Sequence, residues 1–412
     1  MKVLPVISLD KYEDIIGEDK GEKIRDAASE LSEYNVVQIN STYQGGGVAE
    51  ILNSLIILLN DVGIKTDWRV LHGDLDFFTI TKKFHNALQG DKINFSDKKK
   101  ELYFINNVNN AIFTHINHDF IVVHDPQPLP IISCYEKKQP WIWRCHIDIT
   151  SPYPPLWAYL KTFISQYDTM VISMEEFRNK NSDSNIPHRI IKPSIDPLNI
   201  KNREITDETI EKYLSKSGIK LDKPIISQIS RFDKWKDPEG MIKIFKIIKK
   251  KIDCQLILVG SMATDDPEGQ EVFENLEKMV EKEQDIHLIM NAPDIVINAI
   301  QRASTVNVQK SIKEGFAITV SEALWKNTPV VASNVGGIPS QIIDGKDGFL
   351  LHPTDYQGFA DKISYLIKNP KKAEEMGTFG RKYVQEHFLI TRHLYDYIQL
   401  FNEKKKKKMV ER

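Results

Sequence analysis

Residues 35–52 read NVVQINSTYQGGGVAEIL. A short β-branched apolar run, three consecutive glycines and apolar residues at helical spacing predict a strand, a turn and a helix. Gly45, Gly46 and Gly47 permit positive φ and close approach of the backbone, which indicates a loop that holds a substrate or a phosphate. A plain turn explains one glycine more readily than three. The stretch is neither a GxGxxG fingerprint nor a P-loop, which disfavours nicotinamide and ATP as ligands.

Short apolar runs alternate with longer helical patterns along the whole chain, which is typical of βαβ units and parallel sheets. We expect strands at 35–39, 66–70, 120–123, 141–145 and 169–172, and at 225–229, 255–259, 286–290, 305–308 and 329–332. Helices are expected between them, for example at 48–62, 241–250 and 355–368.

The pattern restarts near Pro224, after a segment in which Pro193 and Pro197 break regular structure and form a hinge or boundary. We therefore expect two α/β domains, 1–195 and 196–384. An amphipathic helix around 382–401 is expected to pack back onto the first domain, which residues from about 385 to 412 would rejoin.

Composition describes an ordinary globular protein of 412 residues, with a formal charge of −2 and 41% hydrophobic residues. The absence of a basic excess argues against nucleic acid as a partner. Three cysteines without a CxxC pair favour a reducing, cytoplasmic location over a disulfide framework or a zinc site. The N-terminus does not read as a signal peptide, and no apolar run of about twenty residues predicts a membrane span. The basic run 404–408 fits a solvated terminus better than an anionic surface.

Polar side chains follow two predicted strands of the first half. His124 and Asp125 follow the strand that ends at Val123, and His146 and Asp148 follow the strand that begins at Trp141. Ligands of parallel sheets lie at the carboxyl ends of the strands, where imidazoles and carboxylates can orient sugar hydroxyls. We prefer His146 with Asp125 as the binding pair, because His124 and Asp148 are equally well explained as turn caps. No HExxH motif or close carboxylate cluster supports a metal.

Two cations follow the first strand of the second half. Arg231 and Lys236 lie in SRFDKWKD, at a strand-to-helix loop, where they could neutralise a leaving diphosphate without a metal. Solvated surface cations are the alternative. A further loop carries Asp265 and Asp266 before Pro267, which we interpret as a turn and helix start in preference to a magnesium site.

Two carboxylates, Glu314 and Glu322, stand at the ends of EGFAITVSE. A helix that begins near Phe316 would bring both acids towards one end of a cleft, with free backbone amides between them. This combination suits a sugar nucleotide, since carboxylates accept from hydroxyls and amides face phosphates. The alternative is that Glu314 closes a turn and Glu322 is a solvated helix residue.

Taken together, these stretches resemble the retaining glycosyltransferases of the GT-B class, and within them the trehalose glycosyltransferring synthases. The likeness runs through STYQGGGVAEIL, VHDPQPLP, WRCHIDITSP, QISRFDKWKDPEG and KEGFAITVSEALWK, over most of residues 35–345. It implies an α/β fold of two Rossmann-like domains with parallel sheets that face each other across a cleft. One departure is Ala317 in EGFAI, where the family usually has glycine; a positive φ there would cost about 1 kcal/mol.

The resemblance also implies roles on the donor side. Arg231 and Lys236 would hold the diphosphate, and Glu322 the ribose hydroxyls. The transferred glucose would contact Glu314 and the backbone of Gly315, Phe316 and Ala317. Gly46 and Gly47 would approach the diphosphate or the glucose from the other domain.

On the acceptor side, the resemblance places His146 near the reacting centre and implies a glucose site made by Glu50, Asp125, Gln127 and Asp148. The implied activity is retaining transfer of glucose from a nucleoside-diphosphate glucose to free glucose to form trehalose, in a reaction that could be reversible. No cofactor is implied, and Mg²⁺ would at most stimulate.

Alternatives are a trehalose phosphorylase, a catalytically silent sugar-nucleotide-binding protein and, less favoured, a sugar-nucleotide epimerase. The sequence leaves open the nucleotide base and a homodimer.

Overall fold

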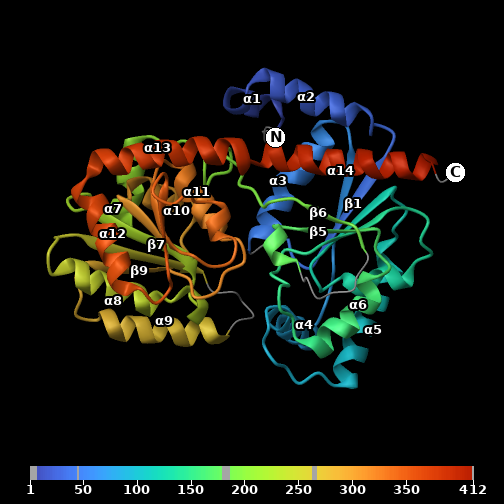
Figure 1. Ribbon diagram of the computed structural model, residues 1–412, viewed down its shortest axis with the longest axis horizontal. Coiled ribbons are helices and arrows are strands. Elements are labelled where there is room, and N and C mark those ends of the chain that lie inside the picture. Colours follow the sequence, from blue (N-terminus) through green and yellow to red (C-terminus); the bar gives the residue numbers. More distant parts are fainter. Residues whose placement is uncertain (1–6, 44–45, 179–185, 262–266, 411–412) are drawn as a thin grey trace. The chain divides into compact units, whose positions relative to one another are not determined.

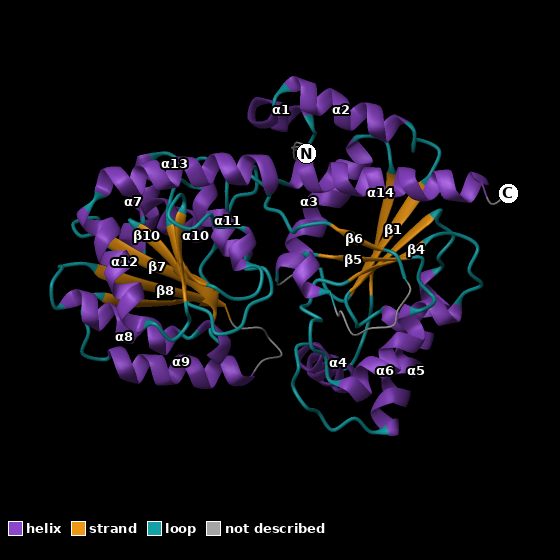
Figure 2. Cartoon of the chain, viewed as in Figure 1, coloured by secondary structure: helices purple, strands orange, loops and turns teal. Residues whose placement is uncertain are grey.

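The computed structural model describes residues 7–43, 46–178, 186–261 and 267–410. The chain forms two compact units (Figure 1). Unit 1 consists of Met1–Pro193 with Ile390–Arg412, and unit 2 consists of Ser194–Leu389. Each unit is built around one parallel sheet of six strands surrounded by helices (Figure 2).

Unit 1 contains a sheet with the strand order β2-β1-β3-β4-β5-β6. Its strands are β1 (Asn35–Asn40), β2 (Lys65–Val70), β3 (Phe120–His124), β4 (Trp141–Arg144), β5 (Thr169–Ile172) and β6 (His188–Ile190). Its helices are α1 (Asp10–Ile16), α2 (Glu18–Ser29), α3 (Gly47–Asp61), α4 (Leu75–Leu88), α5 (Asp97–Thr114), α6 (Pro154–Ile164) and α14 (Ile390–Val410), with short 3₁₀ turns η1 (Leu129–Cys134) and η2 (Glu175–Phe177).

Unit 2 repeats the plan with the strand order β12-β11-β10-β7-β8-β9. Its strands are β7 (Ile225–Arg231), β8 (Gln255–Ser261), β9 (Ile286–Met290), β10 (Val306–Gln309), β11 (Val330–Ser333) and β12 (Gly348–Leu351). Its helices are α7 (Asp207–Lys216), α8 (Pro238–Lys249), α9 (Pro267–Val280), α10 (Asp294–Ala303), α11 (Ile318–Trp325), α12 (Tyr356–Lys368) and α13 (Pro370–His387), with 3₁₀ turns η3 (Lys234–Lys236) and η4 (Ile338–Ser340).

All ten predicted strands are confirmed, with ends that differ by at most two residues. The helical stretch expected around 382–401 is divided in the structure, because α13 ends at His387 and α14 begins at Ile390. Between them Leu389 forms a bridge with Ile195, and the amide of Ile195 donates to the carbonyl of Phe388 at 2.8 Å. This pairing takes the backbone out of the helical conformation, and α14 then belongs to unit 1.

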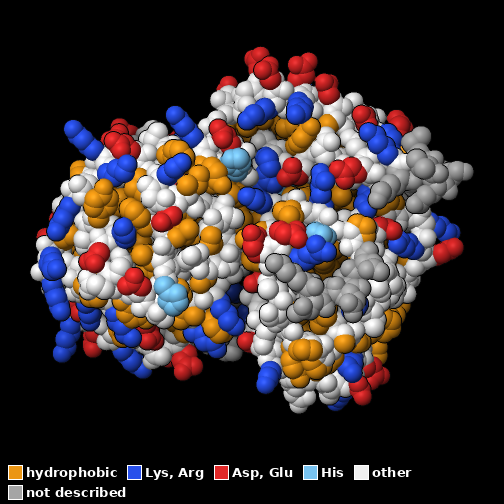
Figure 3. All heavy atoms as spheres, in the orientation of Figure 1, with side chains coloured by type: hydrophobic (Ala, Val, Ile, Leu, Met, Phe, Trp, Pro, Cys, Tyr) orange, Lys and Arg blue, Asp and Glu red, His pale blue; other side chains and the backbone are white. Residues whose placement is uncertain are grey.

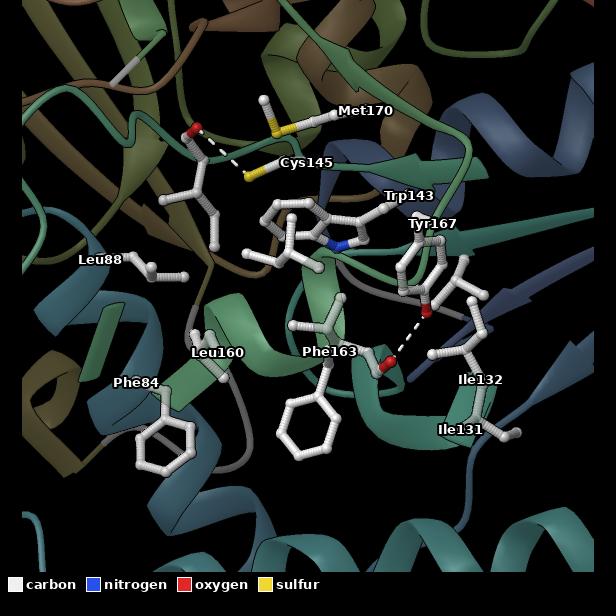
Figure 4. Packing of buried hydrophobic residues seen from close by; sticks show 14 of the residues in the cluster. Phe84, Leu88, Ile131, Ile132, Trp143, Cys145, Leu160, Phe163, Tyr167 and Met170 are labelled. Atoms are coloured by element: carbon white, nitrogen blue, oxygen red, sulfur yellow. Dashed lines mark hydrogen bonds between the residues drawn. The ribbon is translucent and has the colours of Figure 1, made fainter. Parts of the chain in front are cut away.

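The core of unit 1 explains why its inner strands, such as β3 and β5, are apolar runs without alternation. Both faces of a parallel sheet are covered by helices, so successive residues of a strand are buried. Trp143 of β4 is fully buried beside Cys145 and Met170, below which Leu160 and Phe163 of α6 pack (Figure 4). Tight packing of this kind fixes the positions of the strand ends, where polar side chains follow.

Candidate active site

Asp125 and His146 follow β3 and β4, and the structure brings this predicted pair together. Asp125 has a φ of 60°, so the chain turns sharply after β3. Its amide donates to the carbonyl of Arg144 at 2.8 Å, and its carbonyl accepts from Trp143 Nε1 at 3.0 Å. Its Oδ1 accepts from the amide of His146 at 2.8 Å. Burial raises the pKa of Asp125 to about 6, opposed by the His146 amide and by Arg144.

His146 is joined to a second histidine. His146 Nε2 lies 3.0 Å from Nδ1 of His124, whose Nε2 lies 2.8 Å from Oε1 of Gln38. The two imidazoles are stacked, with ring centroids 5.3 Å apart. His124 therefore supports His146 through its ring and does not cap a turn. Burial, with the positive charge of Arg144, lowers the pKa of His124 to about 3 and that of His146 well below its usual value.

The remaining predicted acceptor residues have simpler surroundings. Asp148 Oδ1 accepts from the amide of Thr150 at 2.9 Å and from its hydroxyl, so this carboxylate caps a turn. Gln127 Oε1 is buried without a hydrogen-bond partner in the described part of the chain. Glu50 is half-buried in the first turn of α3, whose N-cap is Gly46 with a φ of 85°. Gly46 needs this positive φ, as the glycine loop predicts, and Gly47 begins the helix. The neighbouring Gly45 lies outside the described residues.

In unit 2, Lys236 and Glu314 form a salt bridge. Lys236 Nζ lies 2.7 Å from both carboxylate oxygens of Glu314, and the two side chains are only 13% and 8% exposed. Glu314 also accepts from Gln309 Nε2 at 3.2 Å, from Ser311 Oγ at 3.0 Å and from the amide of Gly315 at 3.1 Å. Such a network holds a cation and a carboxylate in fixed positions after β7 and β10.

The loop that carries Lys236 is ordered by Asp233. The side chain of Asp233 accepts from the amides of Trp235 and Lys236, at 2.9 and 3.1 Å, and so caps the turn η3. Arg231 Nη2 lies 3.3 Å from the other oxygen of Asp233, and the Arg231 side chain is 48% exposed. Gln228 Nε2 donates to the carbonyl of Lys236 at 2.9 Å. Arg231 thus retains solvent-accessible N–H groups, whereas Lys236 is already paired.

Glu322 is fully buried and is not the solvated helix residue of the alternative interpretation. Lys201 Nζ lies 3.0 Å from its Oε1, and Oε2 has no hydrogen-bond partner among the described residues. Lys326, one helical turn on, donates to Asn202 Oδ1 at 2.8 Å and to Gln301 Oε1 at 2.7 Å. Burial lowers the pKa of Lys326 to about 7, against the opposing charge of Glu322. The two lysines are missed by the sequence predictions, because neither lies at a strand end.

Between the two acids, Ala317 has a φ of 63° and forms the N-cap of α11. The departure from glycine therefore falls in the left-handed region, where a Cβ is unfavourable. Phe316 is buried, and the carbonyl of Gly315 accepts from the amide of Gly337 at 2.6 Å. A Cβ at Gly336 would lie 2.1 Å from the main-chain carbonyl oxygen of Glu314, so the backbones of the two loops are in direct contact there. The predicted turn at Asp265 and Asp266 lies outside the described residues.

Comparison with known proteins agrees with these motifs. Residues 38–179 match the model of the trehalose synthase N-terminal domain, and residues 209–383 match that of glycosyl transferases group 1. The trehalose synthase of Thermococcus litoralis is 43% identical over 402 residues, which are 96% of each chain. The chain belongs to the trehalose synthase family.

More distant similarities of this trehalose synthase family member are found in both sequence and structure. The trehalose phosphorylase of Pleurotus pulmonarius is 25% identical over 93% of this chain and 59% of its own length. The α,α-trehalose-phosphate synthase structure from Burkholderia xenovorans has a TM-score of 0.73 at 13% identity, covering 89% of this chain and 99% of that one. At this identity the likeness shows the fold alone, which is GT-B with two parallel sheets.

Proposed function

We propose that this protein is a retaining glucosyltransferase that makes trehalose from a nucleoside-diphosphate glucose and free glucose. The observation that carries the proposal is the likeness to trehalose synthases over 96% of the chain, which includes both the cationic loop and the His124–His146 region. A test follows from the two products. We expect release of one nucleoside diphosphate for each disaccharide formed, and disaccharide without nucleotide release would contradict it.

On the donor side, we propose that Arg231 and Lys236 contact the diphosphate and that Glu314 orients the transferred glucose. The bonds between Lys236 and Glu314 support these roles, because they leave one ammonium N–H for a phosphate oxygen and fix the carboxylate for sugar hydroxyls. Glu322 is proposed to accept from the ribose hydroxyls, and its Oε2 is an acceptor in need of a donor. Because Glu322 is fully buried, this contact requires Oε2 to become accessible to the ribose, while Lys201 keeps its contact with Oε1.

The acceptor glucose is proposed to lie against unit 1 and to contact His146, Asp125 and Gln127, which follow β3 and β4, and Glu50 in the first turn of α3. Gln127 Oε1, buried without a partner among the described residues, is an available acceptor for a hydroxyl. Asp148 is the weaker member of the predicted set, since its Oδ1 is already occupied by Thr150. The neutral imidazole of His146 can orient a hydroxyl but does not supply charge.

For the chemistry we propose transfer on one face of the sugar. The bond between the anomeric carbon and the phosphate oxygen breaks, the acceptor hydroxyl oxygen bonds to the same face, and its proton moves to the departing phosphate. The cations Arg231 and Lys236 stabilise the negative charge that develops on the diphosphate, so we propose that no metal is required and that Mg²⁺ at most stimulates. A glucosyl group trapped covalently on a carboxylate would contradict this route.

Trehalose phosphorylase is the second candidate, because such an enzyme matches 93% of this chain at 25% identity. In that reaction inorganic phosphate would occupy the place of a nucleotide phosphate. The higher identity and mutual coverage of the synthases favour the nucleotide reaction. Formation of glucose 1-phosphate from trehalose and phosphate would favour the phosphorylase.

The proposed partners are therefore small molecules. On the face shown in Figure 3, lysine and arginine side chains are interspersed with acidic ones. In the described part of the chain, no helix is long and apolar enough to cross a membrane. The cysteines Cys134, Cys145 and Cys254 are all free thiols. We propose on these grounds that the enzyme acts in the cytoplasm.

A further inference from the structure

Three side chains form a hydrogen-bonded row at the candidate acceptor site: Gln38 of β1, His124 of the neighbouring β3, and His146 in the loop after β4. Gln38 lies opposite Val122 in the pairing of β1 with β3, so Gln38 and His124 project from the same face of the sheet. Their contact at 2.8 Å and the contact of 3.0 Å from His124 to His146 make one continuous row. Gln38 and His124 are buried, whereas His146 is half-buried.

The direction of the hydrogen bonds in this row follows from its first member. The carbonyl oxygen of Gln38 can only accept, so Nε2 of His124 carries a hydrogen. A neutral imidazole has one donor and one acceptor, which makes Nδ1 of His124 an acceptor. Nε2 of His146 must then donate to it, and Nδ1 of His146 is left with a lone pair.

The surroundings of both imidazole rings favour their neutral form. Arg144 lies opposite His124 in the pairing of β3 with β4 and is fully buried. Its positive charge, together with burial, disfavours a proton on either histidine. The nearby ring of His393 in α14 also disfavours a proton on His146. Asp125 faces the row from the β3 end and bonds the His146 amide, not its ring.

We propose that Gln38 and His124 are positioning residues that fix His146 as the Nε2–H tautomer, so that Nδ1 accepts a hydrogen bond from a hydroxyl of the sugar substrate. The inference rests on the proposed function for the identity of that ligand. Nδ1 of His146 makes no hydrogen bond within the described part of the chain, so it can accept one from a ligand. A fixed acceptor orients the hydroxyl before reaction, at no further entropic cost.

Nuclear magnetic resonance of the ligand-free protein tests the tautomer directly. The protein is labelled with ¹⁵N in the histidine rings, and the His146 signals are assigned by their loss in His146→Gln. We expect protonated Nε2 and unprotonated Nδ1 in the wild type and in Gln38→Glu, which keeps an acceptor. In Gln38→Met, which is of similar length but accepts nothing, we expect a mixture of tautomers. A wild-type His146 with the hydrogen on Nδ1, or an unchanged tautomer in Gln38→Met, would overturn the proposal.

Steady-state kinetics test the consequence for catalysis. Gln38→Met should lower kcat about tenfold, the effect of one lost net hydrogen bond, with little change in KM for the nucleotide sugar. Gln38→Glu should restore most of kcat, which a merely structural defect would not allow. Equal loss in both variants would count against the positioning role.

A second variant covers the case in which Gln38→Met does not fold. His124→Asn can place an amide oxygen near the position of Nδ1 and so keep an acceptor for His146, whereas His124→Leu cannot. We expect the wild-type tautomer in the first and a mixture in the second, and identical tautomers in both would refute the relay. The tautomer is measured without substrate. Absence of trehalose formation would therefore refute the proposed function without affecting the test of the tautomer.

Discussion

The ion pair of Lys236 and Glu314 gives the sharpest prediction for stability. Each carboxylate oxygen lies 2.7 Å from Nζ, at exposures of 13% and 8%. Removing one partner of a fully buried pair typically costs 3–5 kcal/mol. Glu314 keeps three other hydrogen bonds after the loss of Lys236, so we expect Lys236→Met to lower the free energy of unfolding by about 2–3 kcal/mol.

The assay is a double-mutant cycle on the ligand-free protein, with Lys236→Met, Glu314→Gln and the double variant in chemical denaturation. We expect a coupling energy of about 2 kcal/mol. Lys246 and Glu283 provide a matched control in the same unit, because their 2.9 Å contact has side chains that are 47% and 37% exposed. That pair should couple by less than about 1 kcal/mol.

The same variants connect stability with catalysis. Because we propose that Lys236 faces the departing diphosphate, we expect Lys236→Met to reduce kcat by roughly a hundredfold or more. Circular dichroism controls for the fold. A coupling energy of Lys236 with Glu314 no larger than that of Lys246 with Glu283 would refute the stabilising role of the ion pair. Wild-type kcat/KM in Lys236→Met would refute the role of Lys236 at the diphosphate.

Three further substitutions follow from the geometry. Ala317→Gly should stabilise the protein by about 0.5–1 kcal/mol, because φ is 63° at this position, and a lower Tm would contradict this. Burial raises the pKa of Asp347 from 3.8 to about 6, so ionising it destabilises the fold progressively as pH rises between these values. Asp347→Asn keeps the acceptor for the Ile343 amide. It should therefore raise the free energy of unfolding by at most about 3 kcal/mol above pH 6 and leave it unchanged near pH 4. A gain that does not depend on pH would show that ionisation of Asp347 is not the cause. Lys201→Met should raise KM for the nucleotide sugar about tenfold, because Lys201 holds the Glu322 carboxylate in place. An unchanged KM would argue against a contact between Glu322 and the ribose.

The strands could be predicted because burial on both faces of a parallel sheet leaves apolar runs in the sequence. The edge strand β6 was missed because its residues His188 and Arg189 are polar, and β12 because it is short and follows Gly345 and Lys346 in a turn. The break between α13 and α14 was also missed. It depends on a bridge to a segment almost two hundred residues earlier, which helical periodicity does not record.

Long-range contacts also limit how much of the candidate site can be predicted from the sequence. Strand-end position identified Lys236 and Glu314 separately, but their mutual bonding joins residues 78 positions apart and emerges only from the sheet order. Gln38 did carry a signal, as a polar residue inside the run NVVQI. Its meaning depends on the register of β1 with β3, which places it beside His124.

The central claim is transfer of glucose to free glucose with formation of trehalose. The most direct measurement is ¹³C nuclear magnetic resonance of the product formed from [1-¹³C]glucose and unlabelled UDP-, ADP- or GDP-glucose. We predict a non-reducing disaccharide in which the labelled anomeric carbon is in an α,α linkage, with nucleoside diphosphate released in equal amount. A reducing disaccharide, a β linkage, or hydrolysis of the donor without incorporation of the label would contradict the account.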